Sequence, residues 1–354
     1  MVLIFAVAFG GALLLVPLAA AVGAAVGGAL VDLPRPGEVQ RRPISRTGGY
    51  GLVAAFFLAL LVSIPIADRS FDTKEFGRLA GLTLGAALLV PFAAWDDLKR
   101  LPPLPQLFAQ IVCALIPVLL GVRIESIANT EIAQIAPLVI VPLSVLWIVG
   151  MINALNWLDT MDGLAGGVSL IGALVLFAAS LLQRGEQGEF IQQNSIALLG
   201  LALAGACIGF LAYNFPPARI FMGTSGSMFL GYALGVISII GGAKIATAAL
   251  VLGLPILDTA LVIIQRVIGR RSPFHGGDGT HLVHQMLVAG LGVRQIVGLV
   301  YTLTALFGIL SLALVRGQKI IGFALVGLIV GGLLLLLRRR NARLATGAQR
   351  SAEA

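Results

Sequence analysis

Residues 153–167 read NALNWLDTMDGLAGG and lie between two apolar segments, each long enough to cross a lipid bilayer. Polar groups at the boundary of such a segment are costly to bury, so a dense group of them indicates a function. Four polar residues recur here at intervals of three: Asn153, Asn156, Asp159 and Asp162. In a helix this spacing places them within one broad sector of the surface, which predicts a site for a hard cation or a hydroxyl-rich ligand. A helix start capped by one of the aspartates is the alternative, but it leaves the other acid and both amides unexplained.

The composition predicts an all-α polytopic membrane protein. Of the 354 residues, 58% are hydrophobic and 11% are charged, whereas about a quarter of the residues in an ordinary soluble domain are charged. Apolar runs of roughly twenty residues recur along the chain, as transmembrane helices require. They predict eleven transmembrane helices, near residues 1–30, 48–67, 78–95, 107–123, 136–153, 163–182, 194–213, 225–241, 245–268, 295–315 and 320–337.

The distribution of lysine and arginine predicts the orientation of these helices. With the N-terminus outside, the inner loops and the tail carry about two thirds of the basic residues, as the positive-inside rule expects. The expected organisation is a single transmembrane domain over residues 1–337 and a basic cytoplasmic tail over residues 338–354, with an N-out, C-in topology. The most polar loops then all face the cytoplasm, so we expect the active site at the cytoplasmic face of the plasma (inner) membrane. The net charge of +8 fits basic inner loops and does not indicate nucleic acid.

Further polar motifs lie in these inner loops. Asp96 and Asp97 are adjacent carboxylates that repel each other unless a cation lies beside them, which makes them a candidate Mg²⁺ or general-base site. The first loop carries several arginines, among them Arg46, whose guanidinium groups match phosphate oxygens; orientation-setting charge is the alternative. Phe221 precedes a Gly/Ser turn suited to an anion and is a candidate for stacking on a base, with serine capping of a helix as the alternative.

All three histidines of the chain, His275, His281 and His284, lie within residues 274–286. Because no soft ligand accompanies them, phosphate contact or acid–base work is favoured over zinc binding, and a chance surface cluster is the alternative. Asp258 follows Pro255 in the ninth predicted helix, at a depth where transporters place ionisable groups. A transporter or lipid flippase therefore stays open as an alternative function.

Together, in this order and spacing, the motifs resemble the polyprenyl-phosphate N-acetylhexosamine-1-phosphate transferases, the superfamily of glycosyltransferase family 4 and the phospho-N-acetylmuramoyl-pentapeptide transferases. The resemblance covers nearly the whole chain and is closer to the UDP-GlcNAc:undecaprenyl-phosphate branch. It implies transfer of a sugar-1-phosphate from a UDP-sugar to polyprenyl phosphate with release of UMP, as the first membrane step of cell-envelope glycan synthesis. It also implies Mg²⁺, or alternatively Mn²⁺, as cofactor. The expected partners are the UDP-sugar, the lipid phosphate and the membrane, with a homodimer left open.

The same resemblance implies roles for individual residues. The catalytic residues would be Asp96, Asp97, Asp159, Asp162, His281 and His284. The metal would be held by Asp96, Asp97 and Asn156, and Asp97 would act as base. Substrate contacts would come from Asn153, Asn156, Phe221, Arg46, Asp258 and His275, with Phe221 stacking on uracil.

The sequence departs from the family pattern at several of these motifs. Thr224 stands where the family usually has a metal-binding aspartate, and Gln106 where a lysine is common. Three further departures are Thr160, Gly279 and Val283, in place of glycine, arginine and histidine. The loss of one anionic ligand, one arginine and one lysine lowers the expected affinity for metal and phosphate, so a catalytically degenerate homologue that binds lipid phosphate or a partner is the alternative. Activity is still expected, because Mg²⁺ commonly relies on few protein carboxylates and on substrate phosphates.

Overall fold

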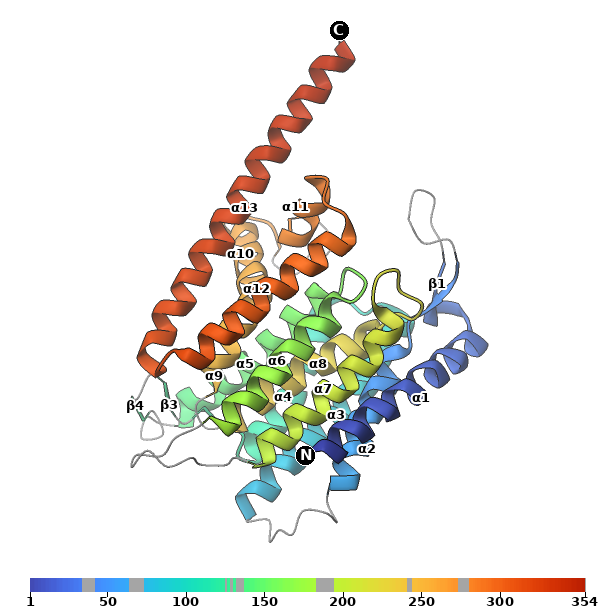
Figure 1. Ribbon diagram of the computed structural model, residues 1–354, viewed down its shortest axis with the longest axis vertical. Coiled ribbons are helices and arrows are strands. Elements are labelled where there is room, and N and C mark those ends of the chain that lie inside the picture. Colours follow the sequence, from blue (N-terminus) through green and yellow to red (C-terminus); the bar gives the residue numbers. More distant parts are fainter. Residues whose placement is uncertain are drawn as a thin grey trace.

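The protein is described by a computed structural model that covers residues 1–33, 42–63, 73–124, 126–127, 130–131, 137–182, 194–240, 244–272 and 280–353. Within these residues it is a bundle of helices with two short hairpins, one at each end of the bundle (Figure 1). The helices are α1 (Val2–Val26), η1 (Gly28–Leu30), α2 (Gly48–Ser63), α3 (Thr73–Lys99), α4 (Pro103–Leu119), α5 (Pro137–Leu158), α6 (Leu164–Leu181), α7 (Asn194–Asn214), α8 (Gly223–Ile240), α9 (Ile245–Val251), α10 (Gly253–Ile268), α11 (Leu282–Val288), α12 (Val293–Ala313) and α13 (Arg316–Glu353). The strands are β1 (Val31–Asp32), β2 (Ile44–Ser45), β3 (Ser126–Ile127) and β4 (Thr130–Glu131). The predicted all-α class is confirmed.

Among the described residues, eight helices are long and apolar enough to cross a membrane: α1, α3, α5, α6, α7, α8, α12 and α13. The pair α9 and α10 is bent by 79° at its break and raises the number to as many as nine if it forms one span. The apolar helices α2 and α4 are shorter, with 16 and 17 residues. Each of the eleven predicted segments is therefore a helix or a bent pair, which supports a polytopic membrane protein. The count of eleven crossings stays a prediction.

The break between α9 and α10 lies inside one of the predicted spans. Pro255 lies in the first turn of α10, where its missing N–H leaves no helical hydrogen bond unmade. The uniform apolar character of residues 245–268 gives no sign of this break, because hydropathy indicates which residues are buried and not in which direction the helix axis runs.

Helix α8 forms the centre of the bundle. Every residue of α8 apart from Thr224 is buried, and α3 and α5 pack against it. A methyl group at Gly49 would lie 2.5 Å from the backbone of Gly226, so α2 and α8 cross with their backbones in contact. This crossing holds the first loop against the start of α8.

The two chain ends lie at opposite ends of the molecule. Figure 1 shows the C-terminal part of α13, together with α11 and the β1–β2 hairpin, at the end away from the N-terminus. Helix α13 continues without a break through the boundary predicted at residue 337. The residues predicted as a tail therefore extend the last apolar helix.

Candidate functional site

A polar cavity of about 510 Å³ opens at the end of the bundle that carries the first loop. Its walls come from segments far apart in the sequence: the β1–β2 hairpin, the residue after α3, the α5–α6 turn and the α7–α8 connection. The lining residues are Asp32, Arg46, Arg100, Asn156, Asp159, Thr160, Met161, Asp162, Asn214, Phe221, Met222, Gly223, Thr224 and Ser227. Five of the predicted site residues thus share one cavity: Arg46, Asn156, Asp159, Asp162 and Phe221, with the substituted Thr224 beside them.

Main-chain hydrogen bonds hold two of these walls together. The Phe221 N–H donates to the Ser45 carbonyl at 2.8 Å, and the Gly48 N–H donates to the Phe221 carbonyl at 3.0 Å. The Gly49 N–H continues the pairing by donating to the Met222 carbonyl at 2.9 Å. Arg46 and Phe221 therefore lie at the same wall, although 174 intervening positions separate them along the chain.

Asp97 lies behind this wall and is 2% exposed. Its Oδ1 accepts a hydrogen bond from the Thr224 N–H at 2.8 Å, and its Oδ2 accepts from the Ser225 N–H at 3.2 Å and the Ser225 Oγ at 3.0 Å. A carboxylate at the first N–H groups of a helix satisfies donors that have no partner within the helix and complements the helix dipole. Gly223 begins α8 beside Asp97 with a φ of 75°, a conformation that would strain any residue with a side chain. Asp97 thereby fixes the start of α8 to the end of α3.

Asp96 points to a different neighbour. Its Oδ1 accepts hydrogen bonds from the Leu101 N–H at 2.8 Å and from Gln106 Nε2 at 2.6 Å. These contacts close the turn between α3 and α4. The predicted pair is thus divided, because side chains of successive helical residues point about 100° apart. Gln106, which replaces the family lysine, supplies the hydrogen-bond donor to Asp96.

The four-residue cluster predicted at positions 153–162 is correct in part. Asn156 lines the cavity and its Oδ1 accepts from Ser227 Oγ at 2.8 Å, while Asp162 Oδ2 accepts from the Ala218 N–H at 2.8 Å. Asn153 turns away, and its Nδ2 donates to Gln110 Oε1 at 2.6 Å. A spacing of three falls about 60° short of a full turn, so the direction drifts along α5. The expectation that Asn153 contacts substrate has no support in this geometry.

Asp159 is the acid of the cavity with the most perturbed ionisation. Burial raises the pKa of Asp159 to about 7, the charge of Arg46 opposes the rise, and the charges of Asp97 and Asp162 add to it. No described residue donates a hydrogen bond to its carboxylate. Asp159 is therefore the carboxylate whose charge an incoming cation or hydrogen-bond donor would stabilise most.

Sequence reasoning did not single out several residues of this cavity, among them Asn214, Asp32 and Arg100. Asn214 is 3% exposed; its Oδ1 accepts from the Gly163 N–H at 2.9 Å and its Nδ2 donates to the Ile220 carbonyl at 2.9 Å. It joins the α5–α6 turn to the α7–α8 connection. Its only sequence signal is an asparagine at the end of an apolar span. Asp32 and Arg100 also line the cavity, and both belong to polar loops in which other residues were favoured.

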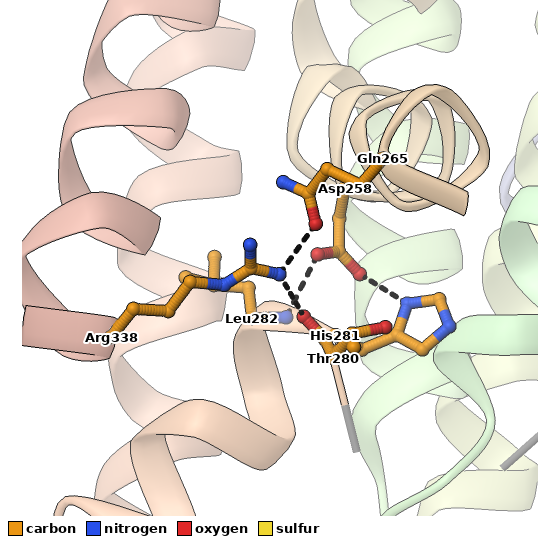
Figure 2. Close-up of polar contacts among 6 residues, drawn as sticks. All are labelled: Asp258, Gln265, Thr280, His281, Leu282 and Arg338. Carbon is orange, nitrogen blue, oxygen red and sulfur yellow. Dashed lines mark hydrogen bonds and ion pairs between the residues drawn. The ribbon is translucent and has the colours of Figure 1, made fainter. Parts of the chain in front are cut away.

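Asp258 and His281 meet outside the cavity lining. Asp258 is 5% exposed, its Oδ2 lies 2.7 Å from His281 Nδ1, and its Oδ1 accepts from the Leu282 N–H at 2.8 Å (Figure 2). The His281 ring lies edge-on to Trp157, with the ring centres 5.6 Å apart. Since Trp157 follows Asn156 in the chain, the histidine segment borders the α5 end of the site. His284 is exposed on α11, and His275 falls outside the described residues.

These contacts remove the reason for considering a transporter. Asp258 was the ionisable group expected to face a path through the membrane or to contact substrate. Both of its oxygens instead bind the start of α11. The Asp258 carboxylate therefore contacts the His281 ring and the Leu282 N–H.

The donor set allows a metal that binds together with substrate. Within the described ranges, no three acidic, histidine or cysteine side chains converge as a complete metal site. Of the predicted ligands, Asn156 lines the cavity, Asp97 lies behind it, and Asp96 faces the α3–α4 turn. Mg²⁺ commonly takes one or two protein carboxylates and completes its shell with phosphates and water. Asn156, together with the acids Asp159 and Asp162 that line the cavity, fits a substrate-bridged ion.

Comparison with known proteins identifies the family. Residues 79–242 match the profile of glycosyl transferase family 4. The chain is 30% identical to the probable undecaprenyl-phosphate N-acetylglucosaminyl 1-phosphate transferase of Bacillus subtilis, over 85% of this chain and 81% of that protein. It is 32% identical to the decaprenyl-phosphate N-acetylglucosaminephosphotransferase of Mycolicibacterium smegmatis, over 87% of this chain and 82% of that protein. A phospho-N-acetylmuramoyl-pentapeptide-transferase of Nostoc is 28% identical over 86% of each chain. This polytopic membrane protein, with its polar cavity at one end of the bundle, therefore belongs to glycosyl transferase family 4.

Proposed function

We propose that this protein transfers N-acetylglucosamine-1-phosphate from UDP-N-acetylglucosamine to a polyprenyl phosphate and releases UMP. An oxygen of the lipid phosphate attacks the phosphorus attached to the sugar, and the bond from that phosphorus to UMP breaks. The observation that carries the proposal is the polar cavity that gathers Arg46, Asn156, Asp159, Asp162 and Phe221. The names of the similar Bacillus and Mycolicibacterium proteins support the acceptor and the sugar.

Each wall of the cavity has a task in this reaction. Arg46 and Arg100 bring positive charge to the pyrophosphate of the donor. Phe221 offers a ring on which uracil stacks. Asp97, held by the start of α8, orients the lipid phosphate and accepts its remaining proton. Catalysis then comes mainly from alignment, because one pyrophosphate bond is exchanged for another.

Asn156, at the cavity wall, would hold Mg²⁺ together with the donor pyrophosphate. When bound, the ion would neutralise charge on the pyrophosphate and stabilise the departing UMP. Thr224 contributes a neutral oxygen to the same wall where the family has an acid. The acids of the cavity, Asp32, Asp159 and Asp162, keep it a cation-attracting site.

An apolar groove gives the prenyl chain a place beside this site. It has a volume of about 440 Å³ and is lined mainly by aliphatic side chains of α1 and α2. Tyr50 and Leu98 also line it. The Tyr50 hydroxyl lies 3.5 Å from Asp97 Oδ2, so a chain lying in the groove brings its phosphate to Asp97. The groove and the cavity lie at the end of the molecule that the N-out, C-in topology of eleven crossings assigns to the cytoplasmic face of the plasma membrane.

The test uses the full-length protein in liposomes with undecaprenyl phosphate and UDP-N-acetylglucosamine. We expect release of UMP that depends on Mg²⁺ and is lost in Asp97→Asn. If UDP-N-acetylglucosamine gives no turnover, a panel of other UDP-sugars separates a wrong donor from an inactive protein. Silence with the whole panel, combined with turnover in Thr224→Asp, would overturn the proposal in favour of a degenerate homologue.

A further inference from the structure

Two residues on one face of helix α10 support the described part of the histidine segment (residues 280–288), Asp258 directly and Gln265 through Arg338. Asp258 and Gln265 are seven residues apart, which is close to two helical turns. Asp258 holds His281 and the first N–H of α11. Gln265 does not touch the segment directly; its Oε1 accepts a hydrogen bond from Arg338 Nη2 at 2.6 Å.

Helix α13 binds the same segment from the other side. Figure 2 shows the Arg338 guanidinium between Gln265 and Thr280, and its Nη2 also donates to the Thr280 carbonyl at 3.3 Å. One turn further along α13, Asn341 Nδ2 donates to Gln285 Oε1 at 2.9 Å and to the Gln285 carbonyl at 3.1 Å. The residue before His281 and a residue inside α11 are thus both tied to α13.

A short helix depends on such contacts for its position. Helix α11 has seven residues, which is too few for a stable helix in isolation. Asp258 sets the direction of the His281 ring by binding Nδ1, but that ring moves with its main chain. The bond from Arg338 fixes the main chain at Thr280, directly before His281. The two contacts together determine both the place and the direction of the imidazole.

We infer that Arg338 is a positioning residue for His281 in the transferase reaction. Its guanidinium connects α10 to the main chain beside His281, so the beginning of the basic C-terminal segment supports the site. The inference rests on the proposed function, in which His281 serves the reaction. It goes beyond the family match, because residues 79–242 contain neither His281 nor Arg338.

The chain supplies a matched control for this inference. Arg338 and Arg339 are adjacent and carry the same charge, but Arg339 is exposed and only Arg338 reaches Gln265 and Thr280. Replacing either by glutamine removes one positive charge from the same part of helix α13, so effects on orientation and lipid attraction are equal. We expect Arg338→Gln to lower kcat about tenfold, because small displacements of a reacting group are costly. Arg339→Gln should stay within about twofold of the parent.

Two further readouts separate positioning from general damage. In a His281→Ala background, Arg338→Gln should cause no further loss of kcat, because residues acting through one another are not additive. Arg338→Lys should recover part of the loss at most, since one ammonium cannot reproduce the guanidinium geometry. Hydrogen exchange of the amides in α11 should accelerate in Arg338→Gln and stay unchanged in Arg339→Gln.

The outcomes also distinguish this inference from the proposed function. Absence of UMP release by the parent protein with every UDP-sugar would refute the function. Hydrogen exchange would still test whether Arg338 holds α11 in place. Equal kcat values for Arg338→Gln and Arg339→Gln would overturn the inference. An additional loss in the His281→Ala background would overturn it too, because Arg338 would then act independently of His281.

Discussion

Asp97→Asn tests whether the joint between α3 and α8 is the centre of the site. The Asp97 carboxylate accepts hydrogen bonds from Thr224, Ser225 and Tyr50. An asparagine has one accepting oxygen, so either the Thr224 N–H or the donors at Oδ2 lose their partner in each orientation of the amide. A lost hydrogen bond to a charged group costs about 1.5–3 kcal/mol. Loss of the proton acceptor costs a further factor of about 100 or more in rate.

The distances predict a graded series with two milder variants. Tyr50→Phe removes a contact of 3.5 Å and should change kcat by no more than about twofold. Ser225→Ala removes a contact of 3.0 Å but leaves the two N–H donors, and should cost about 1 kcal/mol, or roughly fivefold. UMP release and the thermal midpoint are measured for all three proteins in the same liposomes. Retention of more than a tenth of the parent kcat by Asp97→Asn, or a reversed order of the series, would refute the reasoning.

Three further predictions concern the cavity and the groove. The pKa of Asp159, about 7 in the folded protein against 3.8 ordinarily, means that the folded state binds more protons between these values, so its stability falls as pH rises through this window. Asp159→Asn should therefore exceed the parent in thermal midpoint by more at pH 8 than at pH 5, because pH 5 lies early in this window; an equal difference at both would count against the shift. Gly223→Ala forces a side chain onto a φ of 75° and against the Arg46 carbonyl, and should abolish UMP release, whereas Gly150→Ala, which meets open space, should not. Ala54→Phe fills the groove and should raise the KM for undecaprenyl phosphate several-fold while the KM for the UDP-sugar stays unchanged. Equal changes in both KM values would mean that the prenyl chain binds outside the groove.

The apolar runs predict the helices well, because a segment buried in lipid must be apolar along its length and must satisfy its main-chain hydrogen bonds within a helix. They do not predict where a segment bends, and the 79° break after Val251 is invisible in an unbroken apolar sequence. Pro255 is the only local signal, and it was assigned to a continuous span. Hydropathy likewise gives the length of α13 as an apolar helix but not its extension to Glu353.

The site could be predicted as far as its polar residues cluster along the chain. Asn156, Asp159 and Asp162 were found because they are dense in an apolar context, and the structure brings them to one cavity. Asn153 was expected in the same broad sector of the helix surface, but each step of three residues falls about 60° short of a full turn, and the Asn153 amide faces Gln110 instead of the cavity. Asn214 was missed because it is one amide at a helix end, and its importance comes from two contacts across the fold.

The contact of Thr224 with Asp97 explains how a substitution in a family motif leaves the framework of the site intact. The bond to Asp97 comes from the main-chain N–H of Thr224, which any residue except proline would supply at this position. The change of side chain therefore alters the charge of the cavity and not the joint between α3 and α8. The cavity retains Asp32, Asp159 and Asp162 against Arg46 and Arg100, so an added acid at position 224 would increase an existing excess of negative charge. With threonine there, less of that excess must be neutralised before an anionic donor binds. The proposed Mg²⁺ would then be held more by the phosphates of the substrate than by protein carboxylates.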